Sequence, residues 1–170
     1  MSSSPANSND SLGRREIIKI AGSMLTISSL ASFADDAQAK DKEPVAIETV
    51  RESFQAVKYE LNNGGISDLA AIIEKEDYDE IMELTKNYDL EFRKAKMGKA
   101  RKFLTSKEDK EKAVMLCNAV TFDLIGMNKG SRAGQRNIEQ VKKYYGELKV
   151  DVQSFLDLEQ NIDVTAYISQ

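Results

Sequence analysis

The sequence predicts an all-α protein, an up-down four-helix bundle with a short extra helix and a flexible C-terminal tail. Apolar residues recur at intervals of three and four in four long segments, which is the spacing of one helix face. The chain has only two prolines, and 31% of its residues are charged, a balance typical of helical domains in water. Helices that are apolar on one stripe bury it most simply against one another.

The chain is predicted to have three parts. Residues 1–39 form a leader, residues 40–160 form one four-helix-bundle domain, and residues 161–170 form a tail that is expected to be mobile. A domain of this size can bury a continuous core without a disulfide or a metal. Cys117, the single cysteine, lies on the apolar stripe of its helix and is expected to be structural.

The leader has the features of a cleaved twin-arginine signal. Arg14 and Arg15 precede a moderately apolar run over residues 17–34, which is too short and too polar for a transmembrane helix. Ala37 and Ala39 then supply the small-x-small pattern that a signal peptidase accepts. The alternative is that the two arginines belong to an amphipathic first helix. Twin-arginine transport leads to a thylakoid lumen or a bacterial periplasm.

The first long helix is expected over residues 44–62, where Pro44 suits the first turn. Gly64 and Gly65 are expected to end this helix. Ser67 can then cap a short second helix.

The next long helix is expected from Asp77 to Leu104, because Asp77 and Glu80 form a start that resembles a capping box. One stripe of this helix is expected to face the core. Its residues are Tyr78, Ile81, Thr85, Tyr88, Phe92, Ala95 and Phe103.

The third long helix is expected to begin at Ser106 and to end near Gly126 and Gly130. Val114, Thr121 and Ile125 are expected to widen its buried face, which is otherwise set by Ala113, Cys117, Val120, Leu124 and Met127. The last long helix, over about residues 136–159, has the most regular three-four alternation in the chain.

The sequence points away from catalysis. It has no histidine, the commonest general base and metal ligand, and no phosphate loop, cysteine pair or serine-centred elbow. We therefore expect no enzyme activity, no cofactor and no metal site. The acidic residues from Glu74 to Glu83 suit the N-terminus of a helix, and we interpret them in this way. The less favoured alternative is that these carboxylates form the site of a carboxylate-dependent hydrolase. The glycine of a calcium loop is missing from this segment.

Two basic clusters are candidate docking sites for an acidic partner, although ordinary solvation would also explain each. The net charge of −4 argues against nucleic acid. At 100° per residue the first cluster surrounds its helix, so that this end should protrude from the bundle or bend at Gly98. The second lies in a loop expected at the opposite end. The first cluster is Arg93, Lys94, Lys96, Lys99, Arg101 and Lys102, and the second is Lys129, Arg132 and Arg136.

Three segments, residues 58–67, 77–101 and 122–132, resemble the diatom-type extrinsic subunit of photosystem II that is numbered thirty-one in the Psb series. The resemblance covers roughly residues 45–160. This family is related in architecture to the PsbQ-like subunits, which are four-helix bundles on the lumenal side of photosystem II.

The resemblance implies a non-catalytic subunit in the chloroplast thylakoid lumen, attached peripherally to the membrane through the photosystem II core and its neighbouring extrinsic subunits. Its implied role is to support oxygen evolution and ion retention at the manganese cluster, without supplying a ligand to it. The basic segment would dock on acidic lumenal loops. The serine-rich stretch at residues 2–11 resembles the end of a plastid transit peptide and favours the lumen. The alternative is a periplasmic or lumenal helical binding module or assembly chaperone.

Overall fold

A computed structural model describes residues 45–167, and this part of the chain is helical without a β-strand. The prediction of an all-α protein is therefore confirmed for these residues. The predicted export-signal residues Arg14, Arg15, Ala37 and Ala39, like Pro44, lie outside the described residues.

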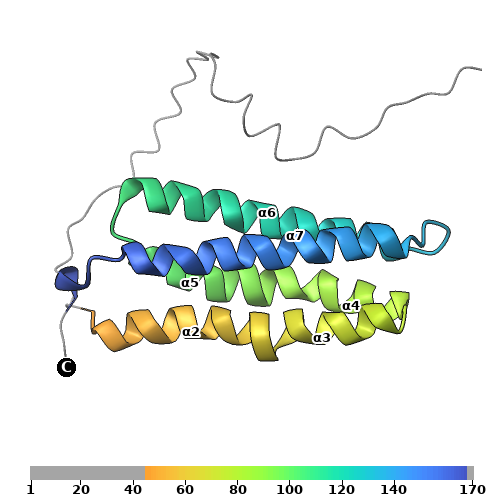
Figure 1. Cartoon of the computed structure of the whole chain (residues 1–170), viewed down its shortest axis with the longest axis horizontal. Coiled ribbons are helices and arrows are strands. Elements are labelled where there is room, and N and C mark those ends of the chain that lie inside the picture. Colours follow the sequence, from red (N-terminus) through yellow and green to blue (C-terminus); the bar gives the residue numbers. More distant parts are fainter. Residues whose placement is uncertain (1–44, 168–170) are drawn as a thin grey trace, which may run out of the picture. The chain divides into compact units, whose positions relative to one another are not determined.

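The first two helices, α2 (Ile47–Asn63) and α3 (Gly65–Glu74), follow each other end to end (Figure 1). Ser67 was predicted to cap the second helix, but α3 begins at Gly65 and Ser67 makes no cap. The start of α3 packs closely against the helix that contains Tyr88, since a Cβ on Gly65 would lie 2.5 Å from the ring of that tyrosine. The glycine therefore lets α3 begin directly beside another helix.

The turn between α3 and the next helix combines a C-terminal and an N-terminal cap. Glu76 has a positive φ of 50°, and its N–H donates to the carbonyl of Ile73 while the N–H of Asp77 donates to that of Ile72. These two bonds form the Schellman arrangement that ends many helices. The Asp77 side chain then accepts from the N–H of Glu80 at 3.1 Å, which confirms the predicted cap.

The next row consists of four segments in series: α4 (Tyr78–Tyr88), the π-helix η1 (Asp89–Met97), α5 (Gly98–Ala100) and the 3₁₀-helix η2 (Arg101–Phe103). Because a π-helix bonds residue i to residue i+5, it inserts an extra residue into the turn. The core stripe accordingly has one interval of five. Its buried members are Ile81, Thr85, Tyr88, Phe92, Met97, Ala100 and Leu104.

The predicted stripe was wrong at Ala95, although Phe103 is partly buried against the core. Ala95 is exposed, whereas Met97 and Ala100 are both 0% exposed. The prediction that this end protrudes or bends at Gly98 was also wrong, since η1 and α5 pack against α2, and η1 and η2 pack against α6. A wheel drawn at 100° per residue cannot place these side chains once the hydrogen-bond ladder changes period.

The last two long helices are α6 (Lys107–Ser131) and α7 (Ile138–Leu156). The Ser106 side chain caps α6 as predicted, and the Asn137 side chain caps α7. α6 ends at Ser131, next to Gly130 as predicted, whereas Gly126, which was also predicted to mark the end, lies inside the helix. A Cβ on Gly126 would lie 2.5 Å from the ring of Tyr144, so this glycine allows close packing of α7.

The described part of the tail is held against the bundle rather than free, which corrects the prediction of a flexible tail for residues 161–167. Two short 3₁₀-helices, η3 (Asp157–Asn161) and η4 (Val164–Ala166), follow α7. The Tyr167 hydroxyl donates to the carbonyl of Phe103 at 2.5 Å, and the two rings pack edge to face. The sequence did not reveal this contact because it joins residues far apart in the chain.

Within residues 45–167 the helices lie side by side in four rows: α2 with α3, α4 through η2, α6, and α7 (Figure 1). α6 packs on α7 and on α4, while α2 packs on η1 and α7. The core includes the stacked rings of Phe54 and Phe155, whose centroids are 5.9 Å apart. The arrangement is consistent with a helical bundle. No helix among the described residues is long and apolar enough to cross a membrane.

Candidate docking surface

Lys96, a predicted docking residue, belongs to a partly buried network around Glu60. The Glu60 carboxylate accepts from the Tyr88 hydroxyl at 2.5 Å, from the Gly65 N–H at 3.0 Å and from the Lys96 ammonium. Burial by itself raises the pKa of Glu60, but the hydrogen bonds from Lys96, Tyr88 and Gly65 outweigh it and lower the pKa. Lys96 therefore joins η1 to α2 and is not a free docking cation.

Arg93 is likewise engaged within the protein. Its guanidinium donates to both carboxylate oxygens of Asp89, at 2.7 and 2.9 Å, and the Thr121 hydroxyl donates to the same carboxylate at 2.7 Å. The hydrogen bond from Arg93 lowers the pKa of Asp89 against the opposing effect of burial. Asp89 thus connects η1 to α6.

Three predicted docking residues form a stripe on the outer side of the same row. Each follows a buried residue, Phe92, Met97 or Ala100, by two positions, which is roughly half a turn of the helix and so turns it away from the core. All three are exposed, and none has a carboxylate within 4.0 Å among the described residues. We call Lys94, Lys99 and Lys102 the lysine stripe.

The second basic cluster lies at the opposite end of the described unit, as predicted. Arg136 donates to Asp79 at 3.3 Å and lies over the ring of Tyr78, at the start of α4. Arg132 reaches only the side-chain oxygen of Asn128, at 3.4 Å. Lys129 is exposed. Two of the three predicted cations in this cluster are therefore available to a carboxylate from outside.

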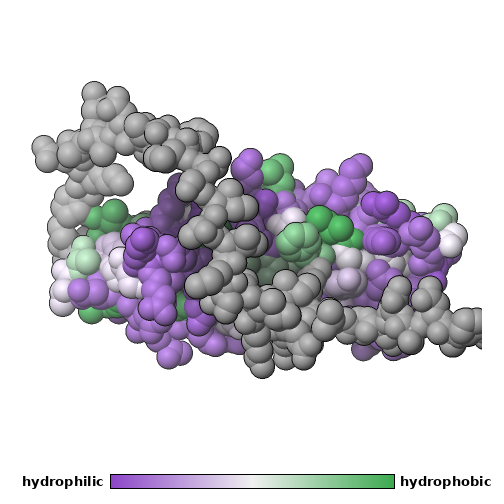
Figure 2. Space-filling view, turned by 90° about the horizontal axis from the view of Figure 1, so that it is seen from above, coloured by the Kyte–Doolittle hydropathy of each residue, from purple (hydrophilic) through white to green (hydrophobic). Residues whose placement is uncertain are grey.

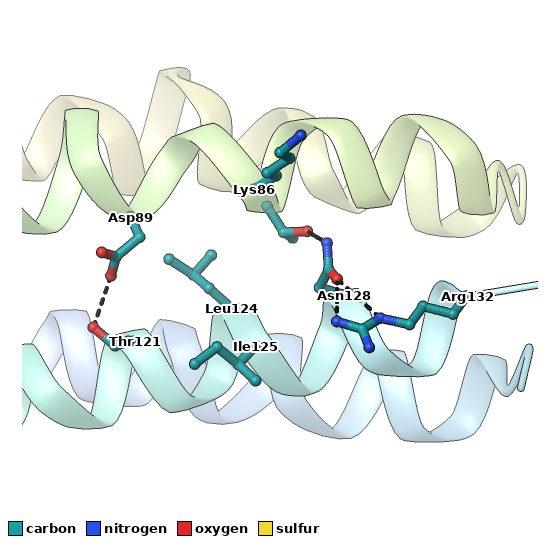
Figure 3. Close-up of a pocket in the computed structure, with 8 residues that line it drawn as sticks. Lys86, Asp89, Thr121, Leu124, Ile125, Asn128 and Arg132 are labelled. Atoms are coloured by element: carbon teal, nitrogen blue, oxygen red, sulfur yellow. Dashed lines mark hydrogen bonds between the residues drawn. The ribbon is translucent and has the colours of Figure 1, made fainter.

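A groove lies between α4 and α6, with a cavity volume of about 260 Å³. We call it the α4–α6 groove. Leu124 and Ile125 lie between the Asp89–Thr121 pair at one end and Asn128 with Arg132 at the other (Figure 3). The lining residues are Thr85, Lys86, Asp89, Thr121, Leu124, Ile125, Asn128 and Arg132.

The outer face of α6 next to this groove carries exposed apolar side chains. Ile125 is 54% exposed and Val114 is 40% exposed, so the prediction that they widen the buried face was wrong. They are exposed because α4 and α7 cover only the other sides of α6. Seen from the α6 side, apolar residues stand among hydrophilic ones (Figure 2). The sequence carried a signal for this face, since Met115, Phe122 and Ile125 share the spacing of one helix side.

Cys117 and the acidic run from Glu74 to Glu83 are the remaining predicted features within the described residues. Cys117 is buried as predicted, and burial raises the pKa of its thiol. The acidic side chains from Glu74 to Glu83 are exposed. No group of three potential metal ligands occurs within residues 45–167. The arrangement of cations and apolar side chains on the surface is suited to binding a macromolecule.

Comparison with known proteins found no matching family model, no matching curated protein and no matching solved structure.

Proposed function

We propose that the protein is a non-catalytic extrinsic subunit of photosystem II, an up-down four-helix bundle that docks on the lumenal face of the core. In this role it supports oxygen evolution and ion retention at the manganese cluster. The proposal rests on the resemblance of residues 58–67, 77–101 and 122–132 to that family and on the placement of their cations.

The observation that carries the proposal is the lysine stripe. Lys94, Lys99 and Lys102 are exposed along one side of a helical row whose opposite side is fixed in the core. A rigid row of cations complements acidic loops of a partner and steers its approach. Lys96, by contrast, is already used by Glu60.

The experiment is rebinding to photosystem II core membranes that have been stripped with concentrated salt. Salt is expected to release the protein, because exposed ion pairs are screened. Replacing Lys94, Lys99 and Lys102 by glutamine is expected to weaken rebinding at least about tenfold, which corresponds to loss of a few surface charge contacts.

The matched control replaces three other exposed lysines, Lys58, Lys75 and Lys110, by glutamine, which changes the net charge equally. Equal weakening by both variants would mean that only net charge matters and would remove the lysine stripe from the site. Wild-type protein that fails to rebind the core at all would contradict the proposed function.

A helical binding module or assembly chaperone of the lumen or periplasm is the second candidate. The exposed apolar face of α6 favours it, since such faces mark sites of protein association. Co-purification separates the two functions: chlorophyll-containing core particles support the first, and a soluble client protein supports the second.

A further inference from the structure

We propose that the outer face of α6 from Met115 to Arg132, together with the α4–α6 groove, binds an acidic amphipathic helix of a partner protein. The inference rests on the proposed function of a docking subunit and names the chemistry of one of its partners. It concerns a different surface from the lysine stripe.

The apolar part of this face has the spacing of a helix-binding surface. Met115, Phe122 and Ile125 are 55%, 57% and 54% exposed, and they extend for roughly 15 Å along α6. Apolar residues at such intervals pack against a second helix whose own apolar residues recur every three or four positions. Ile125 also lines the groove, where one side chain of the partner can enter.

The exposed charge along this stretch of α6 is of one sign, and Asp89, the carboxylate that lines the groove, is already bound by Arg93 and Thr121. From Lys112 to Asn137 the only acidic residue is Asp123, which is buried, although the whole chain has a net charge of −4. Lys129 and Arg132 lie on this face, and Lys86 lies on the α4 wall of the groove. Among the described residues no carboxylate lies within 4.0 Å of these three cations, in contrast to Arg93, Lys96 and Arg136. A partner with glutamates or aspartates flanking its apolar stripe would complement them.

Other occupants fit this face less well. A second copy would meet it through the same face, which offers no exposed carboxylate to Lys129 and Arg132 because Asp123 is buried. An extended peptide would find no strand edge, because α4 and α6 use their backbone groups within the helices. A flat anionic bilayer cannot enter a recess between two helices, whereas a side chain can.

The test measures fluorescence anisotropy of a labelled helical peptide titrated with the full chain. The peptide has about 18 residues, or roughly 27 Å of helix, with leucines every three or four positions and glutamates on both flanks. We expect a Kd of roughly micromolar order, and at least tenfold weaker binding for Ile125→Ser combined with Arg132→Glu. The control Tyr59→Ser with Lys58→Glu alters an equally exposed aromatic and cation on α2 and should bind like wild type.

Because both altered side chains of the test variant are exposed, the variant should retain its fold, which circular dichroism checks. The single variant Arg132→Glu gives a second measurement of peptide binding. A peptide with lysines in place of the glutamates should not bind. The inference is overturned if the test variant binds the acidic peptide as tightly as wild type does, or if the basic peptide binds equally well. It is also overturned if sedimentation shows a dimer that Ile125→Ser dissociates. Binding to phosphatidylglycerol vesicles that the test variant weakens, without binding of the peptide, would overturn it as well. The peptide assay contains no photosystem, so a negative result does not bear on the proposed function. Rebinding to the photosystem II core tests that function separately.

Discussion

Gly126 lies within α6, where helix propensity alone would favour alanine. The structure gives the opposite preference, because three ring carbons of Tyr144 lie 2.5 Å from the position that a Cβ would occupy. Gly146 in α7 is its counterpart, since no atom lies within 4 Å of the corresponding position. Two glycines in adjacent helices therefore have opposite roles, and only packing distinguishes them.

We predict that Gly126→Ala lowers the free energy of unfolding by about 1–3 kcal/mol, because the α6–α7 contact must open to admit the methyl group. The matched variant Gly146→Ala should raise it by about 0.5–1 kcal/mol through helix propensity. Urea unfolding of both variants checks the pair. Destabilisation by both alanines to the same extent would show that close packing at Gly126 is not the cause.

The Glu60 network has a second residue-scale consequence, since one carboxylate satisfies three donors on three different segments. Removing its charge leaves Lys96 and the Tyr88 hydroxyl with a weaker acceptor in a partly buried place. A lost bond of this kind costs more than a surface ion pair, because the remaining groups stay away from water. The contact between Glu60 and Lys96 is therefore expected to stabilise the fold and not to take part in docking.

At the scale of the element, the π-helix η1 decides which side chains of its row face the core. It places Met97 five positions after Phe92, where an α-helix would place residue 95 or 96. The same shift aligns Lys94, Lys99 and Lys102 on the outside. A single extra residue in one turn thus separates the core stripe from the lysine stripe.

We predict that deletion of Lys94 is tolerated, because the remaining chain can close as an α-helix with Met97 four positions after Phe92. The loss of stability should stay below about 2 kcal/mol, within the range of ordinary substitutions. Deletion of Lys149 from the regular helix α7 should cost several kcal/mol, since it rotates Val152 and Phe155 by about 100° away from the core. Thermal unfolding compares the two, and equal losses would show that η1 is not a one-residue insertion.

At the scale of the whole molecule, two carboxylates that join different rows have lowered pKa values: Glu60 between α2 and η1, and Asp89 between η1 and α6. A group with a lowered folded-state pKa contributes stability that is present above its unfolded pKa, about 4.3 for Glu and 3.9 for Asp. That contribution is lost as the pH falls through the folded pKa. The protein should therefore keep its stability from neutral pH down to about pH 5 and lose it progressively below about pH 4.

We predict that Glu60→Gln lowers the free energy of unfolding by about 1–3 kcal/mol at pH 7, because the hydrogen bonds to the buried charge are weakened. Its difference from wild type should narrow as the pH falls from about 4.3 through the lowered folded-state pKa of Glu60, because the wild-type protein then loses the contribution of this charge. Glu48→Gln, at an exposed ion pair with Arg51, should change stability by less than about 0.5 kcal/mol. Urea unfolding across this pH range is the measurement, and a pH-independent difference for Glu60→Gln would contradict the role of its charge.

At this scale the predicted docking cations fall into two groups, those with a carboxylate partner within the protein and those without one. The predicted cations Arg93, Lys96 and Arg136 each have a carboxylate partner within the described residues. Lys94, Lys99 and Lys102 do not, nor do Lys129 and Arg132. The net charge of −4 does not reveal this division, because it sums all 24 basic and 28 acidic residues of the chain.

The sequence by itself determined the helical class of the described residues, the caps at Asp77 and Ser106 and most of the apolar stripe of α7. Each of these depends on residues only a few positions apart, and local hydrogen bonds and helix periodicity act over that range. The two basic clusters were also visible, with their positions at opposite ends of the unit.

Only the tertiary structure decided the shift of the stripe after Phe92, the close contact at Gly126, the fixed position of Tyr167 and the exposure of Ile125. The same holds for which cations are free, since the partners of Lys96 and Arg136 lie 36 and 57 positions away in the chain. Contacts over such distances arise when whole helices pack, and a period read along one helix contains no information about the surface that a neighbouring helix presents to it.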